Sequence, residues 1–587
     1  MIRAFRRSFS QKNQLKELAY VNGVSDTPLL AATISQRLRT QALKYAKNPF
    51  QVFYQHGVSY TYEEFDQRVD EIACGLIALG LEKGDRIGMY SPNRPEWSLI
   101  QYAAARADLI LVNVNPAFQT DDLKYALNLA NIKVLVMPEQ FSKSHYVDIV
   151  RHLIPDHATS KSTTISSSMV PDLRHVIVCD HKRHKGMINF DELYSNYSRR
   201  DRKEMEKRER ECDFEAATNI QFTSGTTGYP KGATLTHHNI LNNSFMLGGY
   251  MGYDSETKIC LPVPLYHCFG MVMGSLGALN YGSTAVYPCE GFNPEMSLKA
   301  ISDLGCHVVY GVPIMFSQTH HEYVQNRDKY NLETLNRGVM AGSICPSELM
   351  KKCNKDLGIE YLSIAYGMTE TSPVSFQTKR SDPFEKQVGT VGQVHPHAEV
   401  KIIDEDGKTL MRGEKGEICT RGYCVMEGYF NDPDKTAECI NDKGWMITGD
   451  QGILDDEGYL QIVGRVKDMI IRGGENIFPA EIENYLLKHP NIIDAQVIAV
   501  KDEKMGEEIM ACVILQDPIE PLSHTDIYEF MHGHVAHYKI PKYIRHVKEY
   551  PLTVTGKVKK NEMRDENNKI LSEVHPDDWE YDFNIFV

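Results

Sequence analysis

A stretch of small and hydroxyl-bearing residues, Thr223 to Gly232, reads TSGTTGYPKG. Glycines let backbone N–H groups approach phosphate oxygens closely, and Lys231 adds a positive charge beside them. Residues 219–222 predict a strand, which would place this loop at a strand end. A loop of this composition can approach the phosphates of a nucleotide; its residues are Thr223, Ser224, Gly225, Thr226, Thr227, Gly228, Tyr229, Pro230 and Lys231.

The loop does not match the Walker A pattern of P-loop NTPases. Counted from Gly225, that pattern requires glycine at position 230 and serine or threonine after the lysine. Pro230 and Gly232 occupy these two positions. The sequence therefore disfavours a P-loop NTPase, and for the loop by itself a flexible surface turn remains the alternative.

Four further motifs follow the loop and carry groups that suit nucleotide chemistry. Tyr366–Glu370 (YGMTE) holds an aromatic ring, a hydroxyl and a carboxylate close together. Trp445–Asp450 (WMITGD) sets a carboxylate beside a glycine turn, and Gly464–Asp468 (GRVKD) follows it. The last motif, Thr553–Lys557 (TVTGK), ends in a lysine.

In this order and spacing, the five motifs resemble the core motifs of the adenylate-forming superfamily of acyl-CoA synthetases, luciferases and peptide-synthetase adenylation domains. The resemblance extends over roughly residues 30 to 570. It implies that a carboxylate attacks the α-phosphate of ATP and expels pyrophosphate, and that the thiol of coenzyme A then takes the acyl group. ATP, Mg²⁺ and coenzyme A are the implied small molecules.

The resemblance also assigns roles around the phosphates. Residues 223–231 would hold the triphosphate and the departing pyrophosphate. Thr369 and Glu370 would belong to the catalytic centre, where Glu370 holds Mg²⁺, a hard cation that prefers oxygen ligands. From the residues alone, Glu370 has a plainer alternative as a solvated acid after a turn.

The nucleoside would be held by other parts of the chain. Tyr366 would pack on one face of adenine, with the backbone of Ala341, Gly342 and Ser343 on the other. Asp450 would accept the ribose hydroxyls, since a carboxylate can accept two hydrogens at once. Arg465 would approach the same sugar and phosphate. The alternative for Tyr366 is a core aromatic.

Three assignments concern the end of the chain. Lys557 is, by resemblance, the catalytic lysine, which offsets the negative charge that grows in the transition state. Lys467 matches the hinge about which the small C-terminal domain turns between the two half-reactions. Gly473 and Gly474 would line the coenzyme A channel. Without the resemblance, Lys557 would pass for a solvated lysine on a basic tail.

The carboxylic acid should be bound by apolar surfaces. Residues 238–251, 267–273 and 310–316 are rich in apolar side chains, which favour an alkyl or aryl chain over an amino acid. His267 matches the aromatic gate of the family, with a backbone-bonded core histidine as its alternative. The stretches RGYCVMEGY, GRVKDMIIRGGENIFPAEIE and HYKIPKYI look most like the mitochondrial medium-chain acyl-CoA synthetases called family member 2.

The length, charge and cysteine content of the chain exclude several kinds of binding partner and site. At 587 residues the chain should form at least two domains, and its net charge of −14 argues against a nucleic-acid binder. The thirteen cysteines include no CxxC pair, which favours reduced, buried thiols over a metal site or a disulfide scaffold. We expect only small-molecule partners, and the sequence leaves the oligomeric state open.

Two segments indicate where in the cell the protein lies and whether it crosses a membrane. The first sixteen residues carry Arg3, Arg6, Arg7, Lys12 and Lys16 and no acid, which resembles a mitochondrial presequence and predicts the matrix; a frayed basic terminus is the alternative. Between residues 258 and 290 there is no charged residue, but prolines and glycines interrupt the segment. We expect a buried strand–loop–helix–strand there rather than a membrane span.

The elements that would position the motifs alternate between helix and strand. Residues 65–79 carry apolar side chains at three- and four-residue steps, which predicts a helix, and a second helix is expected at 94–107. Residues 86–90, 109–114 and 134–137 predict short strands. This alternation predicts an α/β protein with much parallel sheet.

For the whole chain we expect a large multi-subdomain N-terminal domain, with parallel-rich sheets packed with helices plus a small β-barrel-like part. A small, mobile α+β domain would follow. The mixed-charge run 199–211 predicts a solvated helix face. The predicted division is 1–28 (presequence and disordered arm), 29–464 (AMP-binding domain), 465–468 (hinge), 469–575 (mobile C-terminal AMP-binding domain) and 576–587 (tail).

Several other functions fit the sequence less well. A peptide-synthetase adenylation domain is disfavoured because only a short tail follows Lys560, and a luciferase because the last residues lack Ser-Lys-Leu. A nicotinamide dehydrogenase is disfavoured because no GxGxxG follows a strand. A catalytically silent nucleotide-binding protein of the same fold, and a ligase for another alkyl or aryl acid, remain as alternatives.

Overall fold

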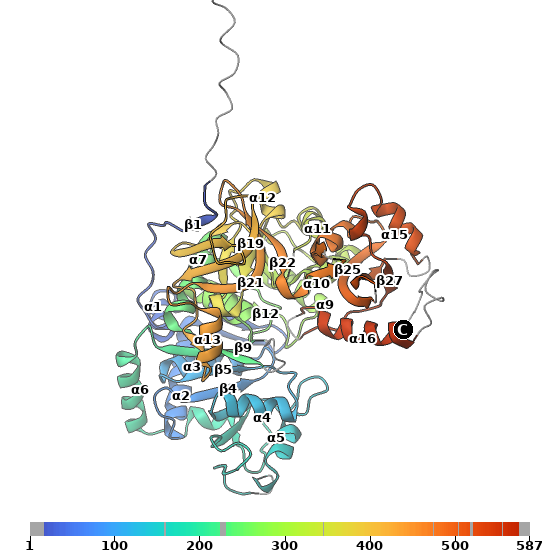
Figure 1. Ribbon diagram of the computed structural model, residues 1–587. Helices are drawn as coiled ribbons and strands as arrows, with labels where there is room; N and C mark the ends of the chain where they lie inside the picture. Colours follow the sequence, from blue (N-terminus) through green and yellow to red (C-terminus); the bar gives the residue numbers. More distant parts are fainter. Residues whose placement is uncertain are drawn as a thin grey trace, which may run out of the picture.

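The computed structural model describes residues 17–157, 160–223, 230–343, 345–473, 475–502, 504–516, 521–553 and 556–573. Figure 1 shows a large body and, to its right, a smaller lobe formed by the red C-terminal part of the chain. Four sheets with helices packed against them confirm the predicted α/β class.

The first large sheet has eight strands in the order β20-β10-β9-β5-β4-β6-β7-β8. From β9 to β8 it is parallel, whereas β10 runs antiparallel to β9. The predicted strands at its centre are β4 (Arg86–Tyr90), β5 (Ile110–Val114) and β6 (Ile132–Met137). They are apolar at nearly every position because both faces of a parallel sheet are covered. The others are β7 (His175–Val178), β8 (Ile188–Asn189), β9 (Ala217–Thr223), β10 (Lys231–Thr236) and β20 (Gly428–Tyr429).

The second large sheet has nine strands in the order β17-β16-β15-β14-β13-β11-β12-β2-β3. Its six central strands, β15 to β2, are parallel, and antiparallel strands border them on both sides. The strands are β2 (Pro49–Phe53), β3 (Val58–Thr61), β11 (Lys258–Cys260), β12 (Thr284–Tyr287), β13 (Val308–Gly311), β14 (Arg337–Ala341), β15 (Tyr361–Gly367), β16 (Val374–Gln377) and β17 (Gln393–Val394).

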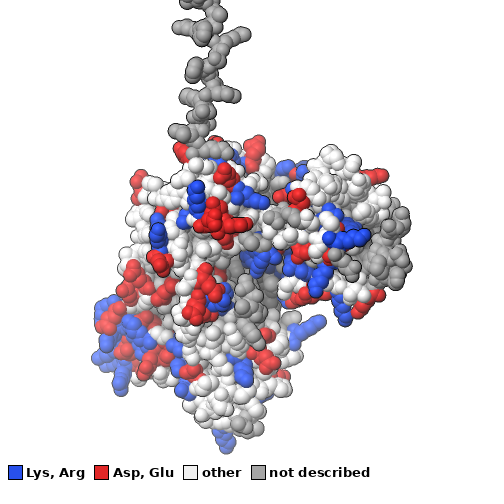
Figure 2. All heavy atoms as spheres, in the orientation of Figure 1, with Lys and Arg blue, Asp and Glu red and all other residues white. Residues whose placement is uncertain are grey.

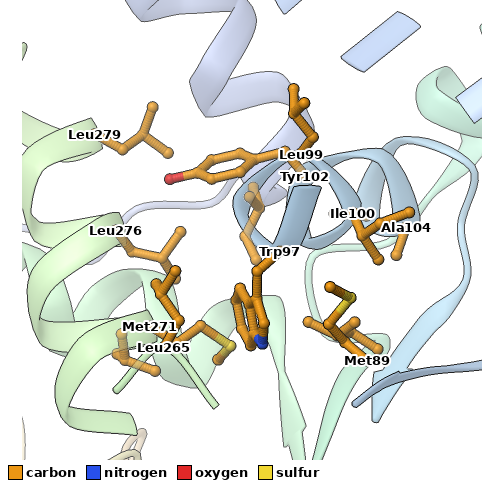
Figure 3. Close-up of a cluster of buried hydrophobic side chains, with 14 of the residues drawn as sticks. Met89, Trp97, Leu99, Ile100, Tyr102, Ala104, Leu265, Met271, Leu276 and Leu279 are labelled. Carbon is orange, nitrogen blue, oxygen red and sulfur yellow. The ribbon is translucent and has the colours of Figure 1, made fainter. Parts of the chain in front are cut away.

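In the main core, the two predicted helices, α2 (Tyr62–Ala78) and α3 (Pro95–Arg106), pack against helices from later in the chain. Their side chains share one buried cluster with those of α7 (His237–Met251) and the π-helix η3 (Phe269–Leu276). Figure 3 shows Trp97 and Tyr102 of α3 pointing toward Met271 and Leu276. Since burial of apolar surface drives folding, this cluster fixes the helices against the sheets.

The uncharged stretch 258–290 is a buried part of this core, as predicted. It forms β11, the π-helix η3, the short helix α8 (Gly277–Tyr281) and β12. Among the described residues, no helix has the length and apolarity needed to cross a membrane.

The mixed-charge run forms α6 (Arg199–Glu211), so the predicted helix is confirmed, but one part of it is not simply solvated. Its Glu209 lies 3.4 Å from the fully buried guanidinium of Arg106. The same guanidinium pairs with Asp66 at 2.6 Å and with Asp70 at 2.7 Å. A helix that looks solvated in sequence therefore supplies one of the carboxylates that neutralise a buried cation.

The third sheet is antiparallel, in the order β1-β18-β19-β21-β22, and corresponds to the part expected to be barrel-like. It is an open sheet, because β1 and β22 at its two edges do not pair with each other. β1 comes from residues assigned to the N-terminal arm, which therefore contributes to the folded body. The strands are β1 (Tyr20–Asn22), β18 (Ala398–Ile403), β19 (Lys415–Gly422), β21 (Met446–Leu454) and β22 (Leu460–Arg465).

The fourth sheet belongs to the C-terminal lobe and follows the 3₁₀ turn η6 (Val466–Asp468). Its order is β24-β23-β26-β25, with β27 parallel to β26. The strands are β23 (Ile470–Arg472), β24 (Glu475–Ile477), β25 (Ile492–Asp502), β26 (Gly506–Leu515) and β27 (Tyr543–His546). The helices are α14 (Pro479–Leu486), α15 (His524–Met531) and α16 (Lys560–Glu573).

Replacing the buried Arg106 tests the charge network. Arg106→Met should lower the free energy of unfolding by about 3–5 kcal/mol, because it leaves clustered carboxylates without their cation. Urea unfolding followed by tryptophan fluorescence measures this loss. Arg380→Met, which breaks an exposed ion pair with Glu360, is the matched control and should cost no more than about 1 kcal/mol. Equal unfolding midpoints for the two variants would contradict the expected role of the network.

Candidate active site

The two ends of the predicted phosphate loop lie opposite each other. Thr223 ends β9, Lys231 begins β10, and the two residues are direct antiparallel partners. The intervening residues Ser224, Gly225, Thr226, Thr227, Gly228 and Tyr229 lie outside the described residues. The carbonyl oxygen of Pro230 accepts a hydrogen bond of 3.0 Å from the phenol of Tyr125. As predicted, the loop begins at a strand end.

Glu370 lies beside the start of this loop. It follows β15, in the 3₁₀ turn η5 (Thr369–Thr371), and is only 5% exposed. Its Oε1 accepts hydrogen bonds from the hydroxyl of Thr223 at 3.2 Å and from the phenol of Tyr429 at 2.9 Å. The backbone can turn this tightly because position 367 is glycine: a Cβ there would lie 1.8 Å from the carbonyl oxygen of Pro373.

Tyr429 is a site residue that the sequence reasoning missed. Its ring lies 4.1 Å below the ammonium of Lys231, so it contacts a phosphate-loop cation and the Glu370 carboxylate at once. The stretch RGYCVMEGY ends with this tyrosine and supported the family resemblance, but no feature of the stretch indicated its contacts. The one available signal was its place in a stretch that supported the resemblance.

Asp450 and Arg465 face each other across β21 and β22, which brings two separate motifs together. Arg465 Nε lies 3.2 Å from Asp450 Oδ1, and the phenol of Tyr366 donates to Oδ2 at 2.8 Å. Asp450 is buried, and burial together with its carboxylate raises the pKa of Tyr366. Tyr366 therefore stays a neutral hydrogen-bond donor, and the predicted adenine and ribose residues form one cluster.

Lys557 reaches this cluster from the far end of the chain. Loss of hydration, followed by the charge of Arg465, lowers its pKa to about 8, while the carboxylates of Asp450 and Glu370 oppose the shift. Two hydrogen bonds join Lys557 to Thr553: the Thr553 hydroxyl accepts from the Lys557 N–H at 2.9 Å, and the Thr553 N–H donates to the Lys557 carbonyl at 2.7 Å.

The turn 341–343 also lies at Lys557, after the end of β14. Gly342 has φ of +92°, and a Cβ at this position would lie 3.8 Å from Cε of Lys557 and 3.0 Å from Cγ1 of Val312. Ala341 is buried, whereas Gly342 and Ser343 are exposed. The left-handed backbone thus favours glycine and keeps the space beside the lysine open.

His267 is a second neighbour of Lys557. Burial, followed by the charge of Lys557, lowers the pKa of His267 to about 3, so its imidazole is neutral at physiological pH. Its Nδ1 accepts a hydrogen bond of 3.1 Å from the backbone N–H of Phe269. The proton of the neutral ring is therefore on Nε2, which can donate a hydrogen bond.

Side chains of the three apolar segments predicted to bind the acid share one buried cluster. The rings of Phe269 and Tyr310 are 5.4 Å apart, and the phenol oxygens of Tyr310 and Tyr253 are 2.7 Å apart. No charged residue occurs in segments 238–251, 267–273 or 310–316. This surface suits a hydrocarbon better than a charged side chain.

The predicted hinge and coenzyme A residues lie past Arg465. Lys467 lies in η6, where partial loss of hydration, followed by the charge of Arg465, lowers its pKa. Gly473 has φ of +57° in the turn between β23 and β24 and donates its N–H to the carbonyl of Met505 at 2.9 Å. Gly474 lies outside the described residues. In the described part of the chain, Gly473 shares no contact with the cluster around Glu370 and Asp450.

The charge distribution matches an anionic ligand. Figure 2 shows Lys and Arg side chains gathered along the junction between the large body and the C-terminal lobe. Cations gathered in this way attract polyanions such as nucleoside triphosphates, although the net charge of the chain is −14.

Two family models match the chain. The AMP-binding enzyme model matches residues 38–430, and the model of the AMP-binding enzyme C-terminal domain matches residues 481–557. The chain therefore belongs to the AMP-binding enzyme family, in agreement with the resemblance of its five motifs. The predicted class of protein is confirmed.

Known relatives resemble nearly the whole chain. The mitochondrial medium-chain acyl-CoA ligase ACSF2 of Danio rerio is 43% identical, over 94% of this chain and 91% of its own length. The ACSF2 ligase of Homo sapiens is 39% identical over 94% and 91% of the two chains. The putative acyl-CoA synthetase YngI of Bacillus subtilis (strain 168) is 39% identical over 93% and 98%.

Solved structures share the fold. The anthranilate CoA ligase AuaEII in complex with anthranoyl-AMP superposes with a TM-score of 0.81 at 20% identity, covering 94% of this chain and 99% of its own. ATP-bound MatB from Rhodopseudomonas palustris gives 0.77 at 24% identity, over 91% and 99%. At these identities the likeness shows the fold alone.

The lowered pKa of Lys557 predicts how ATP consumption depends on pH. Below about pH 8 the side chain of Lys557 is mostly protonated. Above that pH, the protonated fraction falls about tenfold for each pH unit. The kcat/KM for ATP, which reports groups of the free enzyme, should therefore fall about tenfold per pH unit above that point. The guanidinium of Lys557→Arg stays charged, so the remaining activity of this variant should not decrease at alkaline pH. A wild-type profile that stays flat to pH 10 would contradict the role of the ammonium.

Proposed function

We propose that this protein is an ATP-dependent fatty acid–CoA ligase, which forms an acyl-adenylate and pyrophosphate and then acyl-CoA and AMP. The observation that carries the proposal is the convergence of Lys557 with Glu370, Asp450 and His267. These residues lie in separate parts of the sequence, and together they supply the charges needed where a carboxylate attacks a phosphate. A silent nucleotide-binding protein would have no need of a lysine held in this position.

The first half-reaction brings two anions together, so the protein must neutralise them. Residues 223–231 hold the triphosphate by backbone N–H groups and by the ammonium of Lys231. Tyr366 and the turn 341–343 flank adenine, and Asp450 and Arg465 bind the ribose. Lys557 bridges the carboxylate of the acid and the α-phosphate, where negative charge grows as the bond to pyrophosphate breaks.

Mg²⁺ enters with ATP as part of the substrate. Glu370 fits this cation because it is a buried carboxylate beside the phosphate loop. Among the described residues, no group of three or more His, Cys, Asp or Glu side chains is arranged to hold a metal ion. The other ligands would therefore be phosphate oxygens and water, which is the usual way in which proteins bind Mg²⁺ with a nucleotide.

His267 orients the acid. Its neutral ring offers Nε2–H to a carboxylate oxygen, since Nδ1 already accepts from Phe269. Thr369 belongs to the same catalytic centre. A neutral donor steers the carboxylate without forming a tight ion pair that would weaken its attack.

The second half-reaction needs a different arrangement of the small domain. The sulfur of coenzyme A attacks the acyl carbonyl, the bond to AMP breaks, and AMP leaves with the electron pair. Lys467 in η6 acts as the hinge, and Gly473 and Gly474 then line the channel for coenzyme A. The proposed division is an AMP-binding domain at 29–464, a hinge at 465–468 and a mobile domain at 469–575.

The acid is most simply a medium-chain fatty acid. The uncharged segments 238–251, 267–273 and 310–316 favour a hydrocarbon, and the ACSF2 relatives carry the medium-chain name. Their names also say mitochondrial, and the basic residues 1–16, which lie outside the described residues, fit a presequence. We place the protein in the mitochondrial matrix on this basis, although the bacterial relative shows that the enzyme type does not require that compartment.

A chain-length series tests the substrate class. Purified protein with Mg·ATP should form AMP and pyrophosphate with octanoate, and thioester when coenzyme A is added. The kcat/KM should peak at medium length and fall for acetate and for long chains. AMP formation with none of the acids offered would refute the ligase, and a maximum with an aryl acid would refute the fatty acid.

A substitution of Lys557 should impair the first half-reaction and spare the second. Lys557→Ala should lower the rate of adenylate formation by about 100-fold or more, as loss of a transition-state charge contact does. Supplied octanoyl-AMP and coenzyme A should still give thioester at nearly the wild-type rate. Rapid-quench assays of each step measure both effects. An equal loss in both steps, with an unchanged melting temperature, would remove Lys557 from this role.

A further inference from the structure

We propose that the phenol of Tyr429 is a positioning residue, which holds Oε1 of Glu370 so that only Oε2 is presented to the Mg²⁺ of Mg·ATP. This inference rests on the proposed function. It gives a defined task to a residue that none of the five sequence motifs contains.

The first support is the pattern of hydrogen bonds on the carboxylate. The donors that the described residues direct at Glu370, the Tyr429 phenol at 2.9 Å and the Thr223 hydroxyl at 3.2 Å, both bind Oε1. An ionised carboxylate bonded in this way cannot rotate without losing charge-assisted hydrogen bonds. One oxygen is therefore committed to the protein, and the other remains for a ligand.

The second support is that Tyr429 is held independently of Glu370. Its strand β20 pairs with β10, where Tyr429 is the register partner of Ala233. Its backbone N–H donates to the hydroxyl of Thr436 at 2.8 Å, and the residue is 7% exposed. The sheet fixes where the phenol lies, so the phenol can impose a position on the carboxylate rather than follow it.

The third support is the ammonium of Lys231 on the ring face. At 4.1 Å from the ring centre, this contact is a close cation–π interaction. One aromatic side chain thereby fixes the distance between the cation that binds phosphate and the carboxylate that binds Mg²⁺.

This arrangement suits Mg²⁺ in particular. The ion demands near-octahedral geometry at short distances and usually keeps several waters. A carboxylate that presents one oxygen occupies one coordination position and leaves the others for phosphate and water. A carboxylate free to rotate could chelate through both oxygens or turn away from the loop.

The test is Tyr429→Phe, which keeps the ring and its contact with Lys231 but removes the hydroxyl. The Mg²⁺ concentration for half-maximal AMP formation should rise about tenfold or more, because one charge-assisted hydrogen bond is lost. The KM for octanoate and the rate of thioester formation from supplied octanoyl-AMP should not change. Tyr429→Leu, which also removes the ring, should in addition raise the KM for ATP.

Direct binding gives a readout that needs no turnover. Electron paramagnetic resonance of Mn²⁺, with protein and α,β-methylene-ATP, should show about tenfold weaker binding for Tyr429→Phe than for wild type. Tyr330→Phe is the matched control: its phenol also donates at 2.9 Å to a glutamate Oε1, that of Glu322, and it is also 7% exposed. This control should leave Mn²⁺ binding unchanged.

Equal Mn²⁺ affinity in Tyr429→Phe and Tyr330→Phe, with both proteins folded, would overturn the positioning role. Because the Mn²⁺ measurement does not depend on catalysis, it decides this question separately from the ligase reaction. Wild-type protein that binds Mn²⁺ and the ATP analogue but forms no AMP would instead overturn the proposed function.

Discussion

Charges of opposite sign held together in a partly dehydrated space are the constraint on which this site depends. Lys557 lies near the carboxylates of Glu370 and Asp450, and Arg465 lies against Asp450. Loss of water strengthens each of these attractions, and it also makes any unpaired charge costly. Loss of hydration, followed by the charge of Arg465, lowers the pKa of Lys557, and a bound anionic substrate would raise this pKa again.

Antiparallel strand pairs hold Lys231, Asp450 and Arg465 in place. Thr223 faces Lys231 across β9 and β10, and Asp450 faces Arg465 across β21 and β22. Register partners in a sheet have little freedom to move apart, because the ladder hydrogen bonds fix their backbones. Tyr429 extends this principle from β20, since its strand pairs with the one that carries Lys231. The large parallel sheets and the apolar core beneath them supply the rigid support.

Lys557 is the exception, because it is delivered by the C-terminal lobe. Gly556, with φ of +79°, lies at the surface of the large body, where a Cβ would come within 2.9 Å of Val312. The lobe is joined to the body through the short turn η6. We expect a lysine brought by a separately built lobe to leave the site without displacing Asp450 and Arg465, as the two proposed half-reactions at one site would require.

The sequence by itself predicted the elements and supplied the residues of the candidate site. Apolar periodicity at 65–79 and the short runs such as 86–90 gave α2 and β4, since such local patterns directly reflect burial. Only the tertiary structure decided which residues meet. The bonds of Tyr429 to Glu370 and of Glu209 to Arg106, and the pairing of β1 into the third sheet, join residues far apart in sequence. Such contacts depend on how the chain packs over long range, and no local spacing encodes them.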